Sequence, residues 1–218
     1  MSVYFLNAEF NYPPNVIDEV VLTVSGYISN VTRDLEIKKP FDVTIYPNHK
    51  WTEDTGGVDG HAMSGGVLQI RIDLRDSIYS VKELLGTPLQ AVVYHECNHI
   101  ARWQGPGYGW SLLEATISEG VATVYEKMKT DAHEMPHANY SNVEELLEVY
   151  RIRDKTNDTS YNYNAWFLGF DPKYPKFIGY KVGTYIIEKV LELNPDLSVK
   201  QLTTMEVDEI IKLSKVDL

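Results

Sequence analysis

The sequence predicts an α+β fold, in which a small mixed or antiparallel sheet with an edge strand packs on a mainly helical domain. Two short segments in the first half alternate between apolar and polar residues, as half-buried strands do. The second half is dominated by stretches whose apolar residues recur at helical spacing. The 218 residues fit a single domain, with an N-terminal α/β lobe over about 1–104 and a C-terminal helical lobe over about 105–218.

The first half is expected to hold one long helix and two strands. A helix is expected over 13–35, because a Pro-Pro pair opens it and apolar residues then follow one face. The segment 41–46 alternates and is stopped by a proline, so it is expected to be a strand. A glycine-rich loop is expected over 55–66, and it carries His61. The segment 67–74 alternates again and is expected to be the second strand.

The second half is expected to be helical. The first of its helices starts at a Thr-Pro pair and stops at Gly-Pro-Gly, residue types that favour the two ends of a helix. Two glycines four residues apart in a later helix would allow close contact with a neighbouring helix. The expected helices cover residues 87–104, 110–130, 177–193 and 198–213, and a further helix is expected to begin over 141–147.

The helix expected over 87–104 carries His95, Glu96 and His99 in the pattern His-Glu-x-x-His. Residues four apart lie on one face of a helix, so both imidazoles can bind the same metal ion. Glu96 then lies close enough to accept a proton from a water molecule at that metal. Because zinc in hydrolases is held by such ligands, the motif predicts metal-assisted hydrolysis of amide bonds.

A catalytic zinc needs a third protein ligand and one open position. Glu114 and Glu119 both lie on the next expected helix, about 140° apart around its axis, so only one of them can face the metal. We expect this ligand to be Glu119, because it follows His99 by twenty residues, which lets one helix end and a second return. Gly120 beside it would let the two helices approach closely. Glu114 is then expected to support the site or to face solvent.

These residues resemble the gluzincin pattern of zinc metallopeptidases, in which a glutamate follows His-Glu-x-x-His by about twenty residues. More closely, HECNHIARW and SLLEATISEGVAT are similar to the YjaZ-type family of predicted zinc-dependent proteases, and residues 174–183 are similar to a downstream segment of that family. The likeness spans roughly residues 40 to 215. It implies a zincin-like domain with the His-Glu-x-x-His helix at the cleft. Thr123 departs from the thermolysin pattern, which has aspartate there.

The resemblance also implies where a substrate binds. In gluzincin-like enzymes an edge strand precedes the metal helix, and an extended substrate pairs with it through main-chain hydrogen bonds. We therefore expect substrate contacts from Leu68 and Ile70 on the second strand and from His61 before it; an ordinary internal strand is the alternative. Related folds use a tyrosine to stabilise the oxyanion, and Tyr180 is the candidate, with a packing role as the alternative.

Composition limits the partners. The formal net charge of −11 argues against binding to nucleic acid or to an anionic membrane surface. No segment is long enough to cross a membrane, and no signal peptide is visible. Cys97 is the single cysteine, which fits a reducing compartment. We expect a cytoplasmic monomer that acts on a peptide or protein substrate, with Zn²⁺ as its cofactor.

Two other functions stay open at this stage. The first is a zinc-containing binding or regulatory protein with a catalytically silent site. However, structural zinc sites usually have four protein ligands, often cysteines, and this chain has one cysteine. The second is a cysteine hydrolase that uses Cys97. This thiol lies about 160–200° around the helix from each histidine, so a buried apolar role suits it better.

Overall fold

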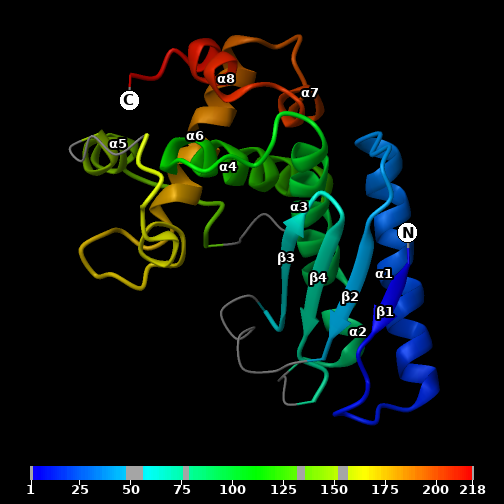
Figure 1. The fold of residues 1–218 in the computed structure, drawn as a ribbon. Helices are drawn as coiled ribbons and strands as arrows, with labels where there is room; N and C mark the ends of the chain where they lie inside the picture. Colours follow the sequence, from blue (N-terminus) through cyan, green and yellow to red (C-terminus); the bar gives the residue numbers. More distant parts are fainter. Residues whose placement is uncertain (1, 48–55, 76–78, 132–135, 152–156, 218) are drawn as a thin grey trace. The chain divides into compact units, whose positions relative to one another are not determined.

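The computed structural model describes residues 2–47, 56–75, 79–131, 136–151 and 157–217 (Figure 1). The chain divides into two compact units. The first consists of Met1–Gln104 with Met128–Ala132, and the second of Gly105–Lys127 with His133–Leu218.

The first unit contains a four-stranded mixed sheet with the order β1-β2-β4-β3. β1, β2 and β4 run parallel to one another, and β3 pairs with β4 in the antiparallel sense. The prediction of an α+β fold with a small mixed sheet is therefore confirmed. The strands are β1 (Val3–Phe5), β2 (Asp42–Tyr46), β3 (Val58–Ser64) and β4 (Val67–Ile72).

Two long helices cover one face of this sheet. They are α1 (Pro14–Asp34), which contacts β1, and α3 (Thr87–Gln104), which contacts α1, β3 and β4 (Figure 1). A short helix, α2 (Val81–Leu84), precedes α3. The core between helices and sheet is aliphatic and includes the fully buried side chains of Val20, Val24, Ile28, Val43, Ile45, Leu68, Ile70 and Leu89.

The prediction that the strand expected over 67–74 lies at the sheet edge is wrong. β4 pairs with β2 on one side and β3 on the other, so it is internal. Leu68 and Ile70 are fully buried, and their side chains belong to the core rather than to a substrate surface. The edge is formed by β3, whose residues were expected in a loop. Thr55, where that loop was expected to start, is outside the described residues.

The second unit is helical in the residues that the structure describes. α4, α5, α6 and the pair α7 and α8 confirm the helices expected from the sequence, whereas the short π-helix η2 was not predicted. The elements are α4 (Leu112–Lys129), α5 (Val143–Arg151), η2 (Asn164–Leu168), α6 (Ile178–Leu193), α7 (Val199–Thr203) and α8 (Val207–Ser214).

Two glycines allow α4 and α6 to cross at backbone contact distance. A Cβ atom added at Gly120 would lie 2.3 Å from the carbonyl carbon of Gly183. A Cβ atom added at Gly183 would lie 2.1 Å from the carbonyl oxygen of Thr116. Any larger residue would separate the helices, so these glycines fix the position of α4 against α6 within this unit.

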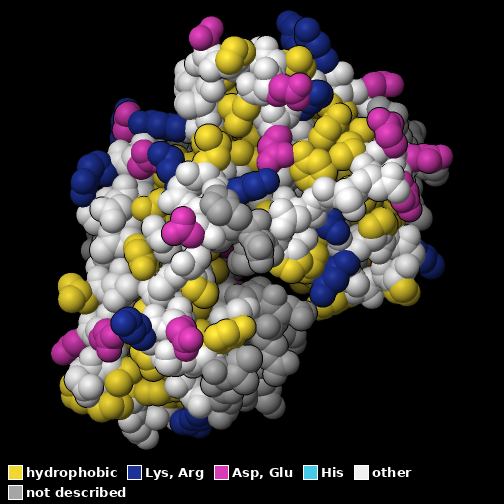
Figure 2. Space-filling model, turned by 180° about the vertical axis from the view of Figure 1, so that it is seen from behind, with side chains coloured by type: hydrophobic (Ala, Val, Ile, Leu, Met, Phe, Trp, Pro, Cys, Tyr) yellow, Lys and Arg dark blue, Asp and Glu magenta, His cyan; other side chains and the backbone are white. Residues whose placement is uncertain are grey.

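Basic and acidic side chains are interspersed over the face drawn in Figure 2, although the whole chain carries a formal net charge of −11. Among the helices in the described part of the chain, none is both long and apolar enough to cross a membrane.

Candidate metal centre

His95 and His99 lie one turn apart on α3 and face each other. Their Nε2 atoms are 3.1 Å apart, and both side chains are buried. Two imidazoles bound to one zinc by bonds of 2.0–2.1 Å in tetrahedral geometry would place their nitrogens about 3.3 Å apart. The spacing of the two Nε2 atoms therefore suits two ligands of one ion.

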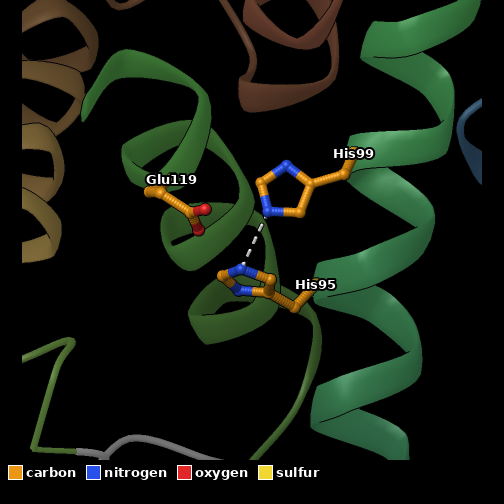
Figure 3. Close-up of side chains that lie close together, drawn as sticks. All are labelled: His95, His99 and Glu119. Atoms are coloured by element: carbon orange, nitrogen blue, oxygen red, sulfur yellow. Dashed lines mark hydrogen bonds between the residues drawn. The ribbon is translucent and has the colours of Figure 1, made fainter. Parts of the chain in front are cut away.

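Glu119 on α4 is the carboxylate that joins these histidines. The ligand atoms of His95, His99 and Glu119 all lie within 4.8 Å of one another (Figure 3). Glu119 is only 2% exposed. A buried carboxylate is costly unless charge or hydrogen bonds compensate it, so its partners are part of the site.

Two tyrosine hydroxyls donate to the same oxygen of Glu119. Tyr108 Oη lies 2.5 Å and Tyr163 Oη 2.9 Å from Glu119 Oε1. Burial first, and then the negative charge of Glu119, raise the pKa of both tyrosines well above the usual value. Both hydroxyls therefore keep their protons and act as donors at neutral pH. Neither tyrosine was assigned a role at the site from the sequence.

Glu114, the other glutamate considered for this role, caps α4. Its Oε2 accepts hydrogen bonds from the backbone N–H groups of Trp110 and Ser111, both at 2.8 Å. Ser111 Oγ in turn accepts from the backbone N–H of Glu114 at 3.2 Å, which completes a capping box. The backbone bond from Ser111 is the main cause that lowers the pKa of Glu114. Glu114 therefore stabilises the N-terminus of α4.

Glu96 is buried against the edge strand. Its Oε2 accepts the backbone N–H of Ala62 at 2.7 Å. A Cβ atom at Gly60 would lie 2.5 Å from Glu96 Cγ and 2.8 Å from Val92 Cγ1. β3 therefore approaches the motif helix so closely that only glycine fits opposite Glu96. An isolated glycine in a strand often marks such an approach, and this was the available sequence signal.

The remaining candidate residues lie on different elements. His61 is exposed on β3, one residue from both Gly60 and Ala62, so its side chain points to the opposite face of the sheet. Tyr180 on α6 has its hydroxyl 3.4 Å from that of Tyr163. The thiol of Cys97 is fully buried, and burial raises its pKa, which makes it a poor nucleophile.

A second group of candidate ligand atoms shares His95. His95, Glu126 and His137 offer atoms that also lie within 4.8 Å of one another. Glu126 Oε2 lies 3.8 Å from His137 Nε2. Glu126 follows Glu119 by two helical turns, so both carboxylates occupy one face of α4.

Two imidazoles and one carboxylate are the donor set of a catalytic rather than a structural zinc site. The chain belongs to the family described as "Predicted Zn-dependent protease (DUF2268)", whose model matches residues 28–212. This membership supports zinc dependence and the protease class. No curated protein and no solved structure matches the chain.

Proposed function

We propose that this chain is a zinc-dependent peptidase of the gluzincin type, close to the YjaZ-type proteases. The observation that carries the proposal is the buried group of His95, His99 and Glu119, whose ligand atoms lie within 4.8 Å of one another. Glu96 directly follows His95 on α3. These three residues would hold the ion. When bound, zinc would polarise the scissile carbonyl and lower the pKa of the attacking water.

Glu96 is the proposed general base. It accepts the proton of the attacking water and delivers it to the leaving amine. The N–H of Ala62 holds Oε2, which fixes the carboxylate and leaves Oε1 to take the proton. A base fixed in this way pays little entropy to reach its reactive orientation. The backbone of β3 thus supports the chemical step directly.

The edge of β3 is the proposed substrate strand, in place of β4. The N–H of Ala62 is donated to Glu96 and so is not part of the ladder with β4. Because the pleat repeats every two residues, the main-chain N–H and C=O groups of Gly60 point away from β4, as those of Ala62 do. Since Glu96 already accepts the N–H of Ala62, an extended peptide would pair with the other outward-facing groups of this edge, and its main chain would then lie beside Glu96. His61 would contact it from the opposite face of the strand.

Tyr180 keeps its proposed role as the hydroxyl donor to the oxyanion. Its hydroxyl lies next to that of Tyr163, which itself bonds the proposed zinc ligand Glu119. A neutral phenol that donates to a developing negative charge stabilises the transition state more than the substrate.

Metal analysis followed by peptide cleavage tests the proposal. We expect one zinc per chain in the purified protein, cleavage of members of a broad peptide library, and loss of cleavage on chelation with recovery on added zinc. Alkylation of Cys97 in the folded protein should have no effect, because the thiol is buried. A protein that binds zinc tightly but cleaves nothing would overturn the peptidase assignment.

A further inference from the structure

We propose that Tyr108 and Tyr163 are positioning residues that fix Glu119 as a metal ligand through one defined oxygen, an inference that rests on the function proposed above. Both hydroxyls converge on Oε1, at 2.5 Å and 2.9 Å. A carboxylate oxygen that accepts two hydrogen bonds has most of its lone-pair capacity used. Oε2 is then the oxygen offered to the metal, and the side chain is held in one rotamer.

The position of Tyr108 is set by the chain on both sides of it. Gly107 and Gly109 have φ values of +100° and +93°, which residues with a Cβ atom rarely adopt. The hydroxyl of Ser118 donates to the carbonyl oxygen of Tyr108 at 2.6 Å. Ser118 directly precedes Glu119, so the same turn of α4 fixes both the tyrosine and the carboxylate that it contacts.

The position of Tyr163 is set by aromatic packing. Its ring stacks on that of Phe167 at 4.6 Å between centroids, with 18° between the planes. Phe167 lies on η2 and is fully buried. The ring of Phe167 also occupies the space beside Gly179 on α6, where a Cβ atom would lie 2.3 Å from it. Tyr163 is therefore held against a buried aromatic side chain of the second unit.

These contacts preorganise the Glu119 carboxylate for metal binding. The carboxylate loses little rotamer freedom on binding, because its neighbours have already fixed it. Hydrogen bonds to charged acceptors are among the stronger ones, so each hydroxyl contributes measurably. Partners of this kind typically change metal affinity by about 10–100-fold when removed.

Zinc affinity of the full chain, measured against a chromophoric chelator, tests the inference. Tyr108→Phe and Tyr163→Phe should each weaken zinc binding by about 10-fold or more. Tyr150→Phe is the matched control, because Tyr150 is fully buried in the same unit and donates to Thr116 Oγ1 at 3.0 Å rather than to a carboxylate. It should leave zinc affinity within about twofold of the wild-type value.

Two further readouts separate positioning from a general loss of structure. The visible absorption spectrum of the Co²⁺-loaded protein should change in Tyr163→Phe and stay the same in Tyr150→Phe. In a Glu119→Ala background, Tyr163→Phe should no longer weaken metal binding, because its partner is gone. Equal weakening with and without Glu119 would overturn the inference.

The result also distinguishes the inference from the proposed function. If the wild-type chain binds zinc and both Phe variants bind it equally well, the positioning role is wrong and the zinc site stands. If the wild-type chain binds no zinc, the proposed function and this inference both fail.

Discussion

Gly120→Ala should destabilise the protein by separating α4 from α6. The new Cβ atom would lie 2.3 Å from the carbonyl carbon of Gly183, whereas ordinary contacts begin at 3.4 Å. The helices must therefore move apart by about 1 Å, because the obstructing atoms belong to backbone. Overpacking of this kind costs about 3 kcal/mol at the upper end of its usual range. The higher helix propensity of alanine offsets about 1 kcal/mol of this cost, so the free energy of unfolding should fall by about 2 kcal/mol.

Gly26→Ala is the matched control. Gly26 lies inside α1, and apart from its chain neighbours and the adjacent backbone of its own helix nothing lies within 4 Å of a Cβ atom added there. This variant gains helix propensity without a clash, so its unfolding free energy should rise by about 0.5–1 kcal/mol. Urea denaturation gives both free energies, and thermal denaturation should show Gly120→Ala about 4–8 °C below the wild type. If both variants were stabilised equally, the close helix crossing inferred here would be wrong.

Three further predictions concern the site and the sheet. Gly60→Ala should displace the Glu96 side chain, because its Cγ lies 2.5 Å from the added Cβ atom. The kcat/KM for peptide cleavage should then fall at least about 10-fold, while the zinc content stays unchanged. Glu119→Ala should weaken zinc binding in a chelator competition far more than Glu114→Ala, which should instead lower the unfolding free energy by about 1 kcal/mol through loss of a cap. Burial raises the pKa of Asp59 to about 6, so the folded state binds this proton more tightly than the unfolded state does. Relative to Asp59→Asn, the wild type should therefore lose up to about 3 kcal/mol of unfolding free energy as the pH rises from about 4 through 6. Urea denaturation at each pH measures this loss.

Long periodic segments made the helices predictable. Over 14–34 the same face of the helix is apolar at every turn, and the fully buried residues Val20, Val24, Ile28 and Val31 follow that spacing. β3 was missed for a physical reason. Its face toward α3 carries Gly60 and Ala62, because Glu96 needs the space, and two small residues do not produce an apolar alternation. The family resemblance placed the edge strand directly before the motif helix, so β4 was expected at the edge, a position that β3 takes instead.

Two of the proposed ligands, His95 and His99, could be recognised from the sequence because their spacing is local, and Glu119 was proposed because it follows them at the distance that a second helix needs. His95 and His99 are one turn apart, and helix geometry alone separates the faces of Glu114 and Glu119. The tyrosine partners were not accessible in this way. Tyr108 reaches Glu119 through glycines with positive φ, and Tyr163 arrives from a segment 44 residues further along the chain. Such contacts depend on tertiary packing, which no local pattern encodes.

The most direct test of the proposed mechanism is Glu96→Gln, with zinc content and peptide cleavage measured on the same preparation. Glutamine keeps the size of the side chain and an oxygen to accept the N–H of Ala62, but it cannot act as the base. Zinc content and thermal stability should stay at the wild-type level, while kcat falls by about 10²–10⁴-fold. Glu148→Gln, on the exposed side of α5, should change neither. Undiminished cleavage by Glu96→Gln, or loss of its zinc, would contradict the assignment of Glu96 as the general base.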